Sequence, residues 1–227
     1  MGLTISYNLN LSSVTVQQVR SKMQALHDIA QKLDFISIGD LVELEGDACQ
    51  IDPTPPNDPH LLLKIQGGKL SFNGSKDFPF QPAAHLIGFN AIPGEGCAMA
   101  TFGLAIPEQC EADWSWFSYC KTQYSSNPEY GGLENFLTCH LKMVHTIDAI
   151  AKLGIGCEVI DNGGYWESRD LEVLSKAIGQ NNLFMAAVMG GLKDRLEDKI
   201  GGILQAPIIQ YPNFEHLEAE GQSHLKP

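Results

Sequence analysis

The chain has 227 residues, of which 44 % are hydrophobic and 19 % charged, and this balance predicts a globular protein and excludes a disordered or fibrous one. Its 27 acidic residues outnumber its 15 Lys and Arg residues, which leaves a net charge of -12. Because an acidic surface repels the nucleic-acid backbone and anionic lipid headgroups, neither nucleic acids nor membranes are expected as partners.

The first residues contain neither the basic nor the apolar segment of a secretory signal, and no apolar run approaches the ~20 residues needed to cross a bilayer. The six cysteines include no CxxC pair. Reduced, buried thiols are the rule in chains that are not secreted. We therefore expect a cytoplasmic protein.

The beginning of the chain predicts a strand, a helix and a second strand. Residues 3–9 alternate as a strand, and Thr15 with Gln18 forms the capping box of an amphipathic helix that reaches Leu33. Residues 36–44 alternate as the second strand. This succession is typical of a sheet covered by helices.

A loop and a hairpin are predicted next. Four prolines within residues 52–59 exclude regular structure there. The glycine pair at 67–68, between apolar runs at 61–66 and 69–72, predicts a β-hairpin with a two-residue turn. Two further strands are predicted over residues 85–92 and 97–106.

The second half of the chain predicts a strand, a helix, a short strand and a long final helix, over residues 114–124, 131–153, 157–161 and 168–199. Gly154 ends the first of these helices, and Ser168 caps the second. The tail after Pro207 predicts irregular structure with at most one short strand and one helical turn.

Strand, helix and strand thus occur twice, at 3–45 and at 114–161. We expect a single α+β domain over residues 1–227, with a mixed β-sheet and helices packed mainly on one face. A ferredoxin-like duplication, with pseudo-duplicated halves 1–92 and 97–205, is one arrangement that this pattern allows.

The second strand–helix–strand unit predicts where a site should lie. A strand that returns through a helix crosses over right-handedly and runs parallel to its starting strand, so the C-terminal ends of strands 114–124 and 157–161 share one edge of the sheet. Ligands of such sheets favour this edge. The residues expected to meet there are Lys121, Gln123, Tyr124, Tyr130, Glu134, Asn135, Asp161, Tyr165, Trp166, Glu167 and Arg169.

Acid–base chemistry needs titratable groups within hydrogen-bond reach of each other. The catalytic candidates are Lys121, Asp161, Glu167 and Tyr165, and the ligand-binding candidates are Gln123, Tyr124, Tyr130, Glu134, Asn135, Trp166 and Arg169. Lys121 would act as a cationic clamp or acid, and Asp161 or Glu167 as a general base. The structural alternative is that the acids only offset the positive end of the final helix and that the aromatic residues cover the core.

Metal binding is not expected. His140 falls on the apolar face of helix 131–153 and predicts a hydrogen-bonded core histidine, whereas His145 falls on the polar face. Their five-residue separation differs from the i, i+4 pair of a helical zinc site. We therefore expect neither a metal nor another cofactor.

No reaction class follows from these residues. The leading hypothesis is that the protein binds a small polar or anionic metabolite at the edge of the sheet, with acid–base chemistry on that metabolite as an extension. The alternative is a non-catalytic interaction module, in which the aromatic strand face or the final helix builds a homodimer.

Overall fold

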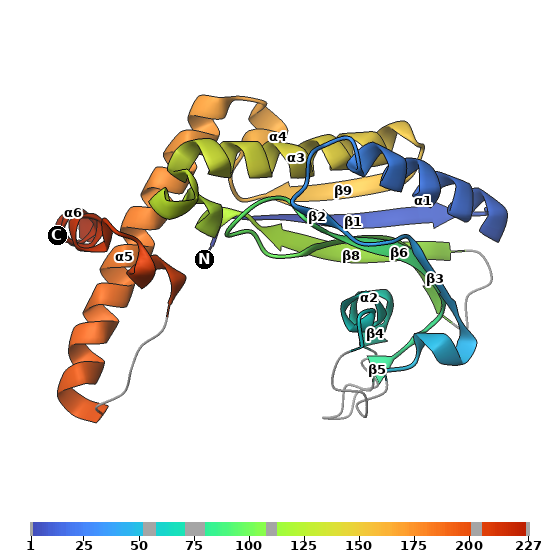
Figure 1. Cartoon of the computed structure of the whole chain (residues 1–227), viewed down its shortest axis with the longest axis horizontal. Helices are drawn as coiled ribbons and strands as arrows, with labels where there is room; N and C mark the ends of the chain where they lie inside the picture. Colours follow the sequence, from blue (N-terminus) through green and yellow to red (C-terminus); the bar gives the residue numbers. More distant parts are fainter. Residues whose placement is uncertain (1, 52–57, 71–79, 108–112, 201–205, 226–227) are drawn as a thin grey trace.

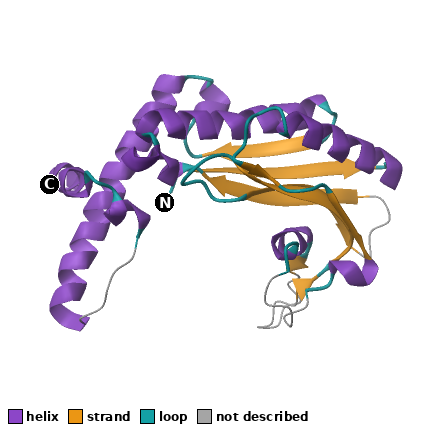
Figure 2. Ribbon diagram, viewed as in Figure 1, coloured by secondary structure: helices purple, strands orange, loops and turns teal. Residues whose placement is uncertain are grey.

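A computed structural model describes residues 2–51, 58–70, 80–107, 113–200 and 206–225. It contains one large sheet, two helices lying across one face of that sheet, and a long helix at one end of it (Figures 1 and 2). The α+β class predicted from the sequence is confirmed.

The large sheet has seven strands in the order β2-β6-β7-β8-β1-β9, with β3 also paired to β6. Every register determined between neighbouring strands is antiparallel. The strands are β1 (Thr4–Ser12), β2 (Ser37–Ile38), β3 (Val42–Glu45), β6 (Ala83–Ile92), β7 (Ala100–Pro107), β8 (Asp113–Lys121) and β9 (Gly156–Asp161).

The four strands β7, β8, β1 and β9 have the order of a ferredoxin-like sheet. Strands β8 and β9 are joined by α3 (Gly132–Lys152) and run parallel with β1 between them, and β1 and β7 run parallel with β8 between them. Two split β-α-β units interleaved in this way are the core of that arrangement. Strands β6, β2 and β3 extend it on one side.

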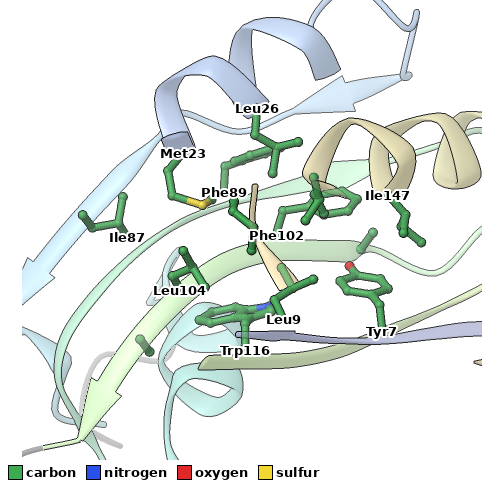
Figure 3. Close-up of a cluster of buried hydrophobic side chains, with 14 of the residues drawn as sticks. Tyr7, Leu9, Met23, Leu26, Ile87, Phe89, Phe102, Leu104, Trp116 and Ile147 are labelled. Atoms are coloured by element: carbon green, nitrogen blue, oxygen red, sulfur yellow. The ribbon is translucent and has the colours of Figure 1, made fainter. Parts of the chain in front are cut away.

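The core lies between the sheet and the helices α1 (Val16–Ala30) and α3. Helix α1 begins with the predicted capping box of Thr15 and Gln18. In the core, Tyr7, Phe102 and Trp116 lie beside aliphatic side chains from α1 and α3 (Figure 3). The Tyr7 hydroxyl and the Trp116 indole N–H both donate to the Thr101 carbonyl, at 2.7 and 3.1 Å, so their polar atoms are satisfied.

The other face of the sheet is covered only in part. Helix α2 (Leu61–Gly67) packs against β6, β7 and β8, and Gly67 fits there because a Cβ would already lie 3.3 Å from Trp116. Beneath β8, β1 and β9 the face is open, and three large apolar side chains are exposed on it, namely Phe117, Tyr119 and Ile160.

The long helix α5 (Leu171–Ile200) begins against α3 and extends beyond the sheet (Figure 1). Its first turns bury Leu174 and Ile178 against Leu3 and Phe136. Its second half packs against α6 (Phe214–Leu225), which is preceded by the short helix η4 (Pro207–Gln210). Within the described segments, no helix has both the length and the apolar character needed to span a membrane.

Three local predictions are wrong. Residues 61–67 form α2 and not the first strand of a hairpin, although the short β4 (Lys69–Leu70) pairs with β5 (Phe80–Gln81). The tail is not irregular, because residues 214–225 form α6. The polar second half predicted for strand 114–124 leaves the sheet after Lys121 and turns into η2 (Gln123–Ser126).

Candidate functional site at the end of the sheet

The C-terminal ends of β8 and β9 lie at the same end of the sheet. Thr4 of β1 is opposite Lys121, and its neighbour Ile5 is opposite Asp161 on the other side. Only the width of β1 therefore separates the two strand ends, as the crossover argument predicts.

Lys121 and Asp161 nevertheless occupy opposite faces of the sheet. Lys121 is exposed on the open face, where it alternates along β8 with buried Cys120. Asp161 lies opposite buried Ile5 and points to the face that α3 covers, with its side chain fully buried. Because side chains alternate between faces along a strand, the two groups do not line one concavity.

Four hydrogen bonds already occupy the Asp161 carboxylate. His140 Nε2 lies 3.1 Å from Oδ2, and the same oxygen accepts the backbone N–H groups of Tyr165 and Trp166 at 2.9 Å. The other oxygen accepts the N–H of Gly163 at 2.8 Å. Three of these bonds fall on Oδ2 and one on Oδ1, and because the side chain is fully buried no substrate proton can reach the remaining lone pair.

These contacts also decide the charge state of Asp161. Burial raises the pKa of the carboxyl, but the hydrogen bond and charge of His140 and the N–H groups of Trp166 and Gly163 outweigh burial. Together they hold its pKa below the ordinary value of 3.8. Asp161 is therefore an ionised structural anion at neutral pH.

Thr122 and His140 extend this group into a buried chain of three residues. Thr122 Oγ1 lies 3.1 Å from His140 Nδ1. The order of hydroxyl, imidazole and carboxylate is that of a nucleophilic triad, but Thr122 and His140 are both 0 % exposed. No substrate reaches the hydroxyl, and the chain instead ties the ends of β8 and β9 to α3. The sequence prediction of a hydrogen-bonded core histidine at position 140 is confirmed.

The residues after β9 are placed on the surface beside α3. Tyr165 and Trp166 begin α4 (Tyr165–Ser168) and are half-buried, whereas Glu167 is exposed. Arg169 makes a two-pronged ion pair with Asp148 of α3, with both N–O distances 2.8 Å, and its guanidinium lies 4.3 Å from the centre of the Trp166 ring. These contacts commit Arg169 to holding α4 against α3.

The remaining candidates lie around η2 and the start of α3. Gln123 is buried, Tyr124 is half-buried, and Tyr130 and Glu134 are exposed. Asn135 donates through Nδ2 to the carbonyls of Ser125 and Glu95, at 2.9 and 3.2 Å. It therefore joins α3 to two loops, and the eleven predicted residues are distributed over both faces of the sheet end and do not form one pocket.

A hollow of about 530 Å³ lies at the same end of the sheet, between the start of β1, the end of β9 and α5. In Figure 1 this is the region where the N-terminus lies beside α5. We call it the end hollow, and its lining residues are Gly2, Leu3, Asn162, Ala177, Gln180, Asn181 and Phe184. A cleft of about 400 Å³ between η1 (Gly46–Cys49) and the β4–β5 ribbon lies near the opposite end of the sheet.

Two of the predicted residues lie near the end hollow without lining it. Gln123 lies behind Gly2, because a Cβ on Gly2 would be 1.9 Å from Gln123 Oε1, and this buried oxygen has no hydrogen-bond partner among the residues that the structure describes. Lys121 is opposite Thr4, whose hydroxyl accepts a 3.0 Å hydrogen bond from Asn162 Nδ2. The sequence did not identify the amides of α5, because nothing in its pattern places α5 beside β1.

The described segments contain no group of three or more His, Cys, Asp or Glu side chains placed to hold a metal ion. The end hollow is instead lined by uncharged amides and apolar side chains, with one lysine nearby. In comparisons with known proteins, the chain matches no family model, no curated protein and no solved structure, so the geometry of this site carries the functional argument.

Proposed function

We propose that the protein binds a small polar metabolite in the end hollow. The observation that carries the proposal is the set of side-chain amides of Asn162, Gln180 and Asn181 around a concave surface, with the unsatisfied oxygen of Gln123 behind it. Buried polar atoms without a partner are rare in folded proteins, and each one needs an explanation. Because this oxygen is buried behind Gly2, a water that bridges it to the ligand would supply the missing donor.

The lining predicts the chemistry of the ligand. Each amide offers both donors and an acceptor, which suits hydroxyl, carbonyl and amino groups. Phe184 is 46 % exposed and supplies an apolar wall. Lys121 lies on the neighbouring strand pair, with no ion-pair partner in the described part of the chain, and would attract a carboxylate or phosphate. A small molecule with hydrogen-bonding groups and one anionic group fits these properties.

The proposal concerns binding and not acid–base catalysis by Asp161. The side chain of Asp161 is fully buried against α3, where it holds four hydrogen bonds, and it does not line the end hollow. A general base needs a free lone pair within hydrogen-bond distance of the proton that it removes. Removing Asp161 should therefore affect stability more than ligand binding.

Binding can be tested by thermal denaturation with a panel of free amino acids, hydroxy acids, sugar phosphates and neutral sugars. A ligand that binds only the folded state raises the melting temperature. At a ligand concentration of about a hundred times Kd, the unfolding free energy increases by about 2.7 kcal/mol. The anionic compounds of the panel should raise the melting temperature of the wild type, and they should raise that of Lys121→Met by less. Lys152→Met, which removes an exposed lysine at the other end of α3, is the matched control and should respond as the wild type does.

The amide substitutions provide the second arm of this test. Asn181→Ala should abolish the thermal shift while leaving the melting temperature without ligand nearly unchanged, because functional polar groups are seldom optimised for stability. If no compound of the panel shifts the wild-type protein, or if Asn181→Ala responds fully, the proposal fails.

A homo-oligomeric module is the second candidate, and one observation favours it. Phe117, Tyr119 and Ile160 are 57, 44 and 69 % exposed on the open face of the sheet, and β9 is an edge strand that can pair with its own copy. Sedimentation equilibrium should then show a dimer that Ile160→Lys dissociates. A wild-type monomer throughout the accessible concentration range would exclude it.

A further inference from the structure

The turn between β6 and β7 is fastened to one face of α3 by three residues spaced four and three apart, Asn135, Cys139 and Lys142. Asn135 Nδ2 donates to the Glu95 carbonyl at 3.2 Å, and Lys142 Nζ donates to the Pro93 carbonyl at 3.0 Å. Such spacing places side chains in one row on a helix. The Cys139 thiol therefore lies in the middle of the contact.

The turn approaches this thiol closely. A Cβ on Gly94 would lie 2.2 Å from Cys139 Sγ, so only glycine fits there. Three residues later the same turn holds Cys97, whose backbone N–H donates to the Gly94 carbonyl at 3.1 Å. The Cys139 thiol donates to Asn135 Oδ1 at 3.6 Å, and the Cys97 and Cys139 thiols are near enough for each to shift the pKa of the other. Cys97 is partly exposed and Cys139 is buried, so one sulfur is accessible to solvent and the other stands behind it.

The surroundings favour a thiolate at Cys139. Its pKa is lowered first by the neighbouring Cys97 thiol, and, against the opposing effect of burial, by the Ser125 hydroxyl and the charge of Lys142. The pKa of Cys97 is raised, first by the neighbouring Cys139 thiol and then by partial burial. Burial raises the pKa of Cys120 to about 12 and that of Cys157 to about 11.

We propose that Cys97 and Cys139 form a reversible intramolecular disulfide by exchange with low-molecular-weight disulfides such as glutathione disulfide. The site is independent of the end hollow and does not rest on its function. In this paired-thiol site the partly exposed Cys97 sulfur reacts with the external disulfide, and the buried Cys139 sulfur then attacks the mixed disulfide on Cys97.

The exchange proceeds in two steps. The Cys139 thiolate takes the proton of Cys97 as the Cys97 sulfur attacks the external disulfide, and one glutathione thiolate leaves. The Cys139 sulfur then attacks the Cys97 sulfur of the mixed disulfide, and the second glutathione leaves, taking the remaining proton into the pool of free thiols. The protein loses one proton and two electrons, and one glutathione disulfide is reduced to one glutathione thiolate and one glutathione thiol. The two sulfurs must approach to ~2.05 Å, and the new bond would hold the turn on α3 covalently.

The full chain can be tested by equilibration in glutathione buffers of graded redox poise, acid quenching, alkylation and peptide mass spectrometry. We expect a peptide pair joined through Cys97 and Cys139 that disappears when reduced glutathione is in excess. Cys139→Ser should stop at the first step and accumulate glutathione on Cys97. Cys120→Ser, which removes a neighbouring buried thiol, is the matched control and should keep the Cys97–Cys139 link.

Oxidation of the unfolded chain is the second control, because urea exposes every cysteine and should yield a mixture of pairings. The proposal is overturned if the native wild type shows no Cys97–Cys139 peptide in fully oxidised glutathione. It is also overturned if the native pairing is as mixed as the pairing in urea.

Discussion

At the scale of single residues, three buried polar side chains tie the ends of β8 and β9 to the middle of α3. Thr122, His140 and Asp161 are each hydrogen-bonded to the next, and the aspartate also holds the backbone of α4. Removing His140 deprives both Thr122 and Asp161 of a hydrogen-bond partner in a buried environment. Such a loss costs about 1–3 kcal/mol for each orphaned group.

Truncating His140 should therefore destabilise the protein more than truncating His145. His140→Ala creates a cavity and leaves Asp161 and Thr122 without their partner, whereas His145 is exposed on the same helix. The difference in unfolding free energy should be about 1 kcal/mol or more. Urea denaturation of both variants measures it, and equal midpoints would show that the network contributes nothing.

The lowered pKa of Asp161 predicts an acid-labile contribution to stability. Because the folded state favours the ionised carboxylate, the stabilisation is complete above the ordinary pKa of 3.8 and is lost as pH falls through the folded pKa. The gap in unfolding free energy between the wild type and Asp161→Asn should therefore narrow as pH is lowered from about 5 to about 2. Urea titrations at several pH values test this, and a gap that stays constant would contradict it.

At the scale of elements, sequence patterns predicted correctly the helix ends that are marked by a capping residue or by a glycine. Thr15 and Gln18 cap α1, and Gly154, with φ of 71°, ends α3 while the N–H of Ile155 bonds the carbonyl of Ile150. These signals lie within a few residues of the feature that they define. They need no knowledge of the rest of the fold.

The wrong predictions concern elements that tertiary contacts decide. The apolar run 61–66 fits a short strand or a short helix equally well, and burial of Leu63 and Gly67 against the sheet selects the helix α2. Helix α6 has few apolar residues, and Phe214 is buried only because α5 and η4 lie beside it. Neither contact is visible in the local pattern.

The candidate site was predictable in position but not in detail. The crossover rule correctly placed the ends of β8 and β9 together. The face of the sheet on which each side chain lies depends on the register of its strand against β1. A register shift of one residue moves every side chain of that strand to the other face. Sequence reasoning lacked that register, so it grouped Lys121 with Asp161, and it had no means of placing Gln180 and Asn181 beside Asn162.

Two glycines test how α5 and α6 pack. Gly179 is exposed in α5 with nothing near its missing Cβ, so Gly179→Ala should stabilise the protein by about 0.5–1 kcal/mol. Gly221 lies where α6 touches α5, and a Cβ there would be 2.2 Å from the Leu183 carbonyl oxygen. Gly221→Ala should destabilise by about 1–3 kcal/mol. Thermal denaturation measures both changes in stability. If both variants were stabilised, or both destabilised, the described packing of α5 against α6 would be wrong.

At the scale of the whole molecule, charge limits the partners. With a net charge of -12, the chain gains no counterion release on binding a polyanion. We therefore expect no retention of DNA or RNA in a filter-binding assay at physiological salt. Tight retention that weakens as salt is raised would contradict this expectation.

The end hollow lies where α5 meets the sheet, so a ligand there would connect these two parts of the molecule. It is lined by the residues next to the start of β1 and the end of β9, and by α5. A ligand bound there would contact elements from both ends of the chain. Binding should thus stabilise the attachment of α5 to the sheet.

The most direct test of the account is an amide-resolved nuclear magnetic resonance titration of the ¹⁵N-labelled chain with the compounds that raise its melting temperature. We expect the shift changes to cluster at Leu3, Asn162, Gln180 and Asn181, and to vanish in Asn181→Ala. Shift changes centred on Phe117 and Tyr119 of the open sheet face, or no changes with any compound of the panel, would contradict the proposed ligand site.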